Sequence, residues 1–158
     1  MESVSRIDIR CASLSDSAAV LKCLAEAFAP YRSAYTPAAF DDTVPDEQGI
    51  RVRIEQMRVL VASSAGDVVG TISATSTSGH GHLRGFAVLP AWHGKGVAAK
   101  LLRAMEDWLV SCGSTQVSLE TTMPLAAAIR FYEKNGYQRS GNISDYFGMP
   151  LIEYVKQL

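Results

Sequence analysis

Hydrophobic and polar residues alternate along several short segments of this chain, and this alternation predicts β-strands. The first such segment, "RIDIR", occupies residues 6–10. Two apolar segments near the middle are joined by the turn sequence "SAGD" at 64–67, which favours a hairpin. The predicted strands cover residues 6–10, 58–63, 68–77, 82–89, 115–121, 137–141 and 150–157.

Other segments repeat their apolar residues at intervals of three and four, which predicts amphipathic helices. One of them, over 48–57, carries only the thin apolar stripe of Ile50, Ile54 and Met57. Residues 31–49 are rich in proline, acidic and aromatic residues, and we expect irregular structure there with one short helix. The predicted helices run from Asp16 to Pro30, over 48–57, over 96–112, and from Pro124 to Asn135-Gly136.

The order of these elements predicts an α/β (α+β) domain built on a mixed, mostly antiparallel sheet of about six to seven strands, with helices on both faces. Strands and helices alternate only in the middle of the chain. There the strand 82–89, the helix 96–112 and the strand 115–121 form one β-α-β unit, whose two strands should be parallel and whose crossover should be right-handed. We expect residues 1–158 to form a single domain.

Composition and charge exclude several classes of protein. Hydrophobic residues make up 47% of the chain and charged residues 20%, while the net charge is -1, so nothing indicates binding to nucleic acid or to an anionic membrane. No apolar run reaches the length of a membrane span, and the first ten residues lack the apolar stretch of a signal peptide. Cys11, Cys23 and Cys112 form no CxxC pair, so we expect buried, reduced thiols in a cytoplasmic protein rather than a zinc site or disulfides.

The segment "AVLPAWHGKGVAAKLL" contains small residues in the connection between the predicted strand 82–89 and the predicted helix 96–112. Gly94, Gly96 and Ala98 leave the first turn of that helix without large side chains. Free N–H groups and the positive end of the helix dipole make such a turn a cradle for phosphate or pyrophosphate. The alternative is a tight turn that needs positive φ angles. The spacing fits neither the P-loop pattern GxxxxGK[ST] nor the dinucleotide pattern GxGxxG.

Two motifs together resemble the Gcn5-related N-acetyltransferases (the GNAT superfamily). "HGKGVA" at 93–98 is similar to the family's pyrophosphate loop, R/Q-x-x-G-x-G/A, through Gly96 and Ala98. "AAAIRFYEKNGY" at 126–137 is similar to the second element, A-x-x-x-Y-x-x-x-G-F/Y, through Ala128 and Tyr132 and then Gly136-Tyr137. The chain departs from the family pattern at His93, where Arg or Gln is usual, and at Leu125, where many members have Asn.

The resemblance implies acetyl-CoA as the acetyl donor, direct transfer to an amine, and a sheet that splays between its two central parallel strands. We expect no metal. The resemblance places the pantetheine arm along the strand before the loop, where main-chain amides can pair with it. Lys95, Lys100 and Arg103 are candidates for the 3′-phosphate, with a solvated helix face as the alternative. The cofactor-binding residues it implies are Phe86, Ala87, Val88, His93, Gly94, Lys95, Gly96, Val97, Ala98 and Ala128.

Acetyl transfer to an amine needs a group that removes the ammonium proton and one that protonates the departing thiolate. The resemblance places Tyr132 over the sulfur as the proton donor; the alternative is a core tyrosine. His82 is the candidate base, because imidazole accepts protons near neutral pH; the alternative is an idle turn residue beside His80. Glu120 is the rival base, acting through water, or it binds the substrate ammonium. It also fits a plain strand end.

The acceptor is harder to predict from the residues. Phe28, Tyr31, Tyr35 and Phe40 gather in the N-terminal part, where they line an acceptor pocket or belong to the core. We expect a small-molecule amine or an amino acid as acceptor. The alternatives are a protein acetyltransferase acting on lysine or an N-terminus, and a non-catalytic acyl-CoA sensor, against which the presence of Tyr132 argues. The oligomeric state is left open, a homodimer included.

Overall fold

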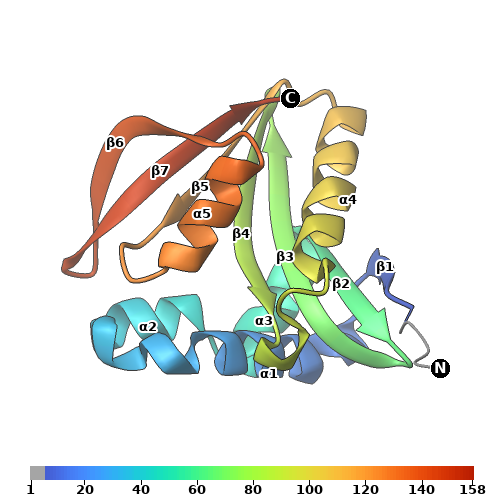
Figure 1. Ribbon diagram of the computed structural model, residues 1–158. Coiled ribbons are helices and arrows are strands. Elements are labelled where there is room, and N and C mark those ends of the chain that lie inside the picture. Colours follow the sequence, from blue (N-terminus) through green and yellow to red (C-terminus); the bar gives the residue numbers. More distant parts are fainter. Residues whose placement is uncertain (1–5) are drawn as a thin grey trace.

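A seven-stranded sheet forms the centre of the computed structural model, which describes residues 6–158 (Figure 1). Residues 1–5, part of the segment expected to lack a signal peptide, lie outside the described residues. The strand order is β1-β2-β3-β4-β5-β7-β6. The strands are β1 (Asp8–Cys11), β2 (Arg58–Ser64), β3 (Asp67–Thr77), β4 (His80–Val88), β5 (Gln116–Thr121), β6 (Gln138–Tyr146) and β7 (Met149–Gln157).

Adjacent strands are antiparallel except for β4 and β5, which confirms the predicted mixed sheet. The α-helices are α1 (Ser17–Phe28), α2 (Pro37–Thr43), α3 (Glu47–Gln56), α4 (Val97–Ser111) and α5 (Ala126–Lys134). Short 3-10 turns cover Leu14–Asp16, Ala29–Ala34 and Pro90–Trp92. The segment 31–49, expected to be largely irregular, is mostly helical because Thr36 caps α2 by accepting a hydrogen bond from the amide of Ala39.

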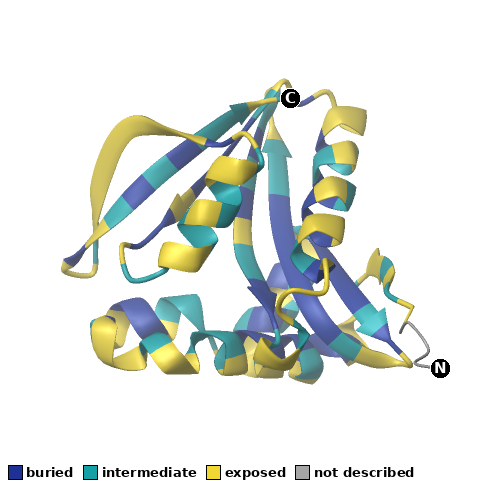
Figure 2. Ribbon diagram, in the orientation of Figure 1, coloured by how far each residue is buried: buried dark blue, intermediate teal, exposed yellow. Residues whose placement is uncertain are grey.

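Helices cover both faces of the sheet, and two apolar clusters hold them there. Leu101, Met105 and Leu109 of α4 pack with Leu60 and Ile72 on one face. Side chains of α1 and α3 pack against the other face, where they meet Val61 of β2 and Ala87 of β4; they are Val20, Cys23, Leu24 and Ile50. Figure 2 shows long buried stretches along β2 and β3, at the centre of the sheet.

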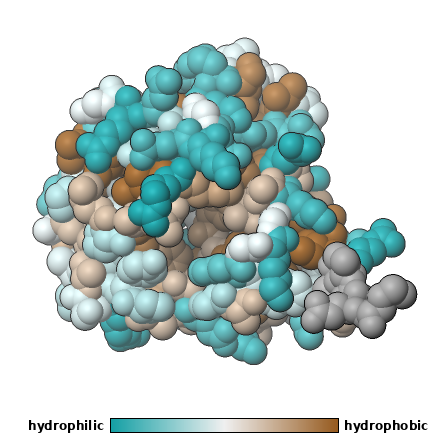
Figure 3. Space-filling model, viewed as in Figure 1, coloured by the Kyte–Doolittle hydropathy of each residue, from teal (hydrophilic) through white to brown (hydrophobic). Residues whose placement is uncertain are grey.

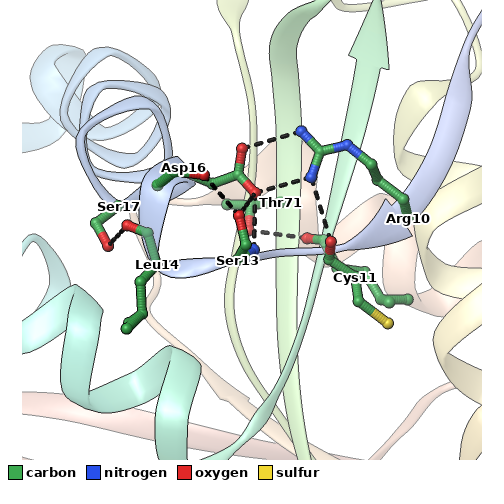
Figure 4. Close-up of polar contacts among 9 residues, drawn as sticks. Arg10, Cys11, Ser13, Leu14, Asp16, Ser17 and Thr71 are labelled. Atoms are coloured by element: carbon green, nitrogen blue, oxygen red, sulfur yellow. Dashed lines mark hydrogen bonds and ion pairs between the residues drawn. The ribbon is translucent and has the colours of Figure 1, made fainter.

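An ion pair fixes the start of α1. Both guanidinium Nη atoms of Arg10 donate to the carboxylate of Asp16, at 2.8 and 2.9 Å, and the amide of Ser13 donates to the same carboxylate at 2.8 Å (Figure 4). These bonds lower the pKa of Asp16 to about 2. They tie the edge strand β1 to the helix that forms one wall of the cavity described below.

The predicted element boundaries differ from the structure at a few places. β4 begins at His80, two residues earlier than predicted, because the turn is confined to Ser78 and Gly79, both with positive φ. β6 extends to Tyr146 rather than 141; its residues are almost all exposed, so no apolar alternation marks them. Only Cys23 is a buried thiol, whereas Cys11 and Cys112 are exposed at the ends of β1 and α4, contrary to the expectation of buried cysteines.

Candidate active site

The sheet opens between its two parallel strands. β4 and β5 pair only from His80–Gln116 to His82–Ser118, and no ladder pairing joins them beyond that point within residues 6–158. The predicted splay of the central strands is therefore confirmed. A cavity of about 950 Å³ occupies the opening, with α5 on one side and α1 to α3 on the other. Figure 3 shows the recess on this face of the molecule.

A β-bulge in β4 rotates the strand where it borders the cavity. Arg84 pairs with Ser73, but Ala87 pairs with Thr71, so two residues of β4 lie opposite one of β3. The extra residue is accommodated at Gly85, whose φ of +60° suits glycine. As a result, the side chain of Phe86 turns to the α5 face, where its ring centroid lies 5.9 Å from that of Phe131.

The glycine loop leaves the N-terminus of α4 uncapped. Gly94 and Gly96 have φ angles of +76° and +80°, so the tight-turn requirement is met at both positions. A Cβ atom on either would meet nothing within 4 Å, and no side chain caps the helix. The first helical hydrogen bond runs from Lys100 to the carbonyl of Gly96, so the amides of residues 97–99 have no helical acceptor. Such a turn suits a phosphate or pyrophosphate ligand.

The predicted cofactor-binding residues mostly line this cavity. Phe86, Ala87, Val88, His93, Gly94, Gly96, Val97, Ala98 and Ala128 do so. His93 donates from Nε2 to the carbonyl of Val88 at 3.0 Å, so it closes the loop. Lys95 is absent from the lining, because its ammonium lies over the Trp92 ring at 5.0 Å. Lys100 and Arg103 are exposed on α4, outside the cavity wall.

The two residues considered as rival bases form a pair. His82 Nε2 lies 2.5 Å from Glu120 Oε2, and both side chains are about one-third exposed. The hydrogen bond from His82 lowers the pKa of Glu120, against the opposing effect of partial burial. A neutral imidazole that donates from Nε2 keeps Nδ1 free to accept a proton. The arrangement can therefore remove a proton from a ligand in the cavity.

Three polar groups of the lining have no hydrogen-bond partner among residues 6–158: the Tyr132 hydroxyl, the Thr121 hydroxyl and the Arg53 guanidinium. The rings of Phe86, Phe131 and Tyr137 hold the Tyr132 ring, with centroids 5.8 to 6.2 Å away. Burial raises the pKa of Tyr132, so its phenol stays protonated and serves as a donor.

The far side of the cavity is closed by contacts between α2 and the β6–β7 hairpin. Tyr146 donates to Asp42 Oδ2 at 2.5 Å, and Arg84 Nη2 lies 3.1 Å from the same oxygen. Thr36 donates to the carbonyl of Phe147 at 2.8 Å. Of the four aromatic residues noted in the N-terminal part, Phe28, Tyr31 and Tyr35 line the cavity, whereas Phe40 is buried in the core beside them.

Sequence reasoning missed several residues of this site. Asp42, Arg53, Arg84 and Tyr146 line the cavity, and none was predicted as a site residue. Asp42, Arg84 and Tyr146 come from three segments that only the tertiary fold brings together. Arg53 did carry a signal, because it stands three residues after Ile50 on the apolar stripe of α3, where a charged residue is unusual.

Comparisons with known proteins agree with this geometry. A family model described as "Acetyltransferase (GNAT) family" matches residues 21–137. N-alpha-acetyltransferase 30 of Schizosaccharomyces pombe is 31% identical over 81 residues, which cover 50% of this chain and 54% of that protein. The match thus spans about half the length of that curated relative.

Solved structures resemble this chain over nearly its whole length. PaiA N-acetyltransferase from Thermoplasma acidophilum, in complex with coenzyme A, has a TM-score of 0.81 at 19% identity, covering 97% of this chain and 99% of that one. YncA, a putative acetyltransferase from Salmonella typhimurium with acetyl-CoA, has a TM-score of 0.76 at 25% identity, covering 98% and 95%. Among residues 6–158, no three His, Cys, Asp or Glu side chains form a metal-binding group, and no helix is long and apolar enough to cross a membrane.

Proposed function

Because the chain belongs to the acetyltransferase (GNAT) family, we propose that its 158 residues form one N-acetyltransferase domain, which transfers an acetyl group from acetyl-CoA to the primary amine of a small molecule or an amino acid. One observation carries the proposal. The uncapped N-terminus of α4, the unpaired stretch of β4 and the His82–Glu120 pair all border one cavity.

The donor occupies the side of the cavity next to α4 and α5. Its pyrophosphate accepts hydrogen bonds from the amides of Val97, Ala98 and Ala99, and the bare backbone of Gly94 and Gly96 lets it approach. The pantetheine arm follows Phe86 to Val88, where the edge of β4 that faces β5 has no strand partner beyond the short β4–β5 ladder. The related structures that contain coenzyme A and acetyl-CoA support this assignment.

The amine is activated by the His82–Glu120 pair. Glu120 remains ionised, because the hydrogen bond from His82 lowers its pKa. It is therefore a weak base but a strong hydrogen-bond acceptor that orients the imidazole. His82 Nδ1 takes the ammonium proton, and the neutral amine attacks the thioester carbonyl. The two residues thus have complementary roles instead of competing for one.

Tyr132 assists the departure of the thiolate. Because burial raises the pKa of its phenol, complete proton transfer to a thiolate of ordinary pKa would be uphill. The hydroxyl therefore donates a hydrogen bond that stabilises the negative charge developing on sulfur. Its lack of a protein partner leaves that bond available for the donor.

A small acceptor fits the closed end of the cavity. The hydrogen bonds from Tyr146 to Asp42 and from Thr36 to the Phe147 carbonyl join α2 to the β6–β7 hairpin. An extended peptide would have to separate these elements. The similarity to N-alpha-acetyltransferase 30 favours a second candidate function, acetylation of a protein N-terminus.

The experiment that tests the proposal measures thiol release from acetyl-CoA with two acceptor sets. One set holds small amines and free amino acids, and the other holds peptides of about ten residues with free N-termini. We expect larger kcat/KM values in the first set. Larger values throughout the peptide set would replace the proposal with N-terminal acetylation. If no amine in either set accelerates thiol release from acetyl-CoA, the proposed transferase activity is refuted.

A further inference from the structure

Arg53 is a buried cation without a partner. Its relative exposure is 9%, and within residues 6–158 its guanidinium makes no hydrogen bond or ion pair. A buried charge with no partner destabilises a fold. Such a group is retained where function requires it.

The backbone opposite Arg53 is shaped to accommodate it. A Cβ atom on Gly85 would come within 2.5 Å of Arg53 Nη1, so any side chain at this position would displace the guanidinium. Gly85 is also the bulge residue of β4, and both residues line the cavity. The bulge therefore brings the bare strand and the guanidinium together at the cavity wall.

The carboxylates that line the cavity with Arg53 are already engaged. Asp42 accepts hydrogen bonds from Arg84 and Tyr146. Burial and the repulsion from Arg84 lower the pKa of Arg53, and the attraction between Arg53 and Asp42 does not outweigh these two effects. Glu120 is paired with His82. The cavity lining as a whole holds three permanent cations, Arg53, Arg84 and Lys134, against these two carboxylates. The cavity lining therefore has one more cation than carboxylates.

We infer that the acceptor carries a carboxylate and that Arg53 binds it, so the substrate is an amino acid or a similar amino carboxylate. This inference rests on the proposed acetyltransferase function. A guanidinium presents parallel N–H donors that match both oxygens of a carboxylate. Gly85, the β4 residue that the Arg53 guanidinium approaches, lies three residues along the strand from His82, which is about 10 Å. The carboxylate and the reacting amine can thus belong to one small molecule.

The position of Arg53 assigns the missing anion to the acceptor and not to coenzyme A. α3 packs on the sheet face that carries α1, where Ile50 meets Val61 and Ala87. The N-terminus of α4, which suits the donor's pyrophosphate, belongs to the opposite face. Arg53→Met should therefore leave coenzyme A affinity unchanged.

The test compares each of the twenty standard amino acids with its own amide, which keeps the amine and the side chain but removes the negative charge. Calorimetry measures binding to the protein saturated with coenzyme A, and thiol release measures transfer. We expect at least one acid to bind and react at least about 30-fold better than its amide. Arg53→Met should abolish that ratio and Arg53→Lys should restore part of it. Arg51→Met, on the same helix but outside the cavity lining, should leave it intact.

Stability provides an independent readout, because Arg53→Met removes an unpaired buried charge and should unfold at the same or a higher temperature than the wild type. If every amide binds as well as its acid, the inference is overturned even when transfer to amides proceeds normally. An equal loss of coenzyme A affinity in Arg53→Met would also overturn it, since the guanidinium would then serve the donor. Acids that bind preferentially but are never acetylated would uphold the inference and overturn the transferase proposal.

Discussion

The pairing of His82 with Glu120 predicts that the two residues act as one catalytic unit. His82→Ala removes the base and should lower kcat/KM by about 10²–10⁴-fold. Glu120→Gln keeps the imidazole but replaces the ionised acceptor of a 2.5 Å hydrogen bond. Hydrogen bonds to charged groups contribute about 1.5–3 kcal/mol, and this one is about one-third exposed. A loss of about 10-fold is therefore expected for Glu120→Gln.

The double variant His82→Ala/Glu120→Gln distinguishes a unit from two independent groups. Once the imidazole is gone, Glu120 has nothing to orient, so the double variant should be no slower than His82→Ala alone. The assay is thiol release at saturating acetyl-CoA with the best acceptor. His80→Ala is the matched control, because His80 precedes His82 by two residues on β4 but bonds Ser118 and Gln116 at 2.7 and 2.8 Å. It should change kcat/KM little.

Two results would refute this reasoning. If the losses multiply in the double variant, the two residues act independently. If Glu120→Gln costs far more than His82→Ala, the carboxylate is the base and the imidazole only lowers its pKa.

Three further predictions concern the donor site and the stability of the fold. Gly96→Glu should weaken coenzyme A binding more than about 100-fold in calorimetry, because the new carboxylate fills the anion site. The control is Gly113→Glu at the other end of α4, where the glycine has a φ of +86° and equally open surroundings. This control variant should bind coenzyme A normally. Tyr132→Phe should lower kcat about 10–100-fold with nearly unchanged coenzyme A affinity, and an unchanged kcat would make Tyr132 a packing residue. Asp16→Asn should lower the free energy of unfolding by about 2 kcal/mol at neutral pH. Because the pKa of Asp16 is depressed to about 2, the wild type should lose this stabilisation only as pH falls from about 4 to about 2. The control Asp8→Asn, at an exposed ion pair, should lose less than about 1 kcal/mol.

The β4–α4–β5 unit could be predicted from sequence because its determinants are local. Gly94 and Gly96 mark the connection between the strand and the helix, and α4 has a clear apolar stripe. The parallel pairing follows from the crossover rule. The same locality explains why most predicted cofactor-binding residues line one cavity.

The bulge at Gly85 and the His82–Glu120 pair could not be predicted in this way. The bulge changes which face Phe86 occupies, and a pattern of period two does not register one inserted residue. His82 and Glu120 are 38 residues apart, and only the register that pairs His82 with Ser118 brings them into contact. Two candidates for one role therefore became partners once the strand register was known.

Acetyl transfer to an amine is the central claim, and the most direct test follows both products in one reaction. The protein is incubated with acetyl-CoA labelled in the acetyl group and with the best acceptor from the amine and amino acid panel. Mass spectrometry of the acceptor and thiol titration of the mixture are then compared. We predict one labelled acetyl group on the amine nitrogen for each coenzyme A released, with both products lost in His82→Ala. Tight binding of acetyl-CoA with no label on any amine or peptide would contradict the account and would indicate an acyl-CoA sensor.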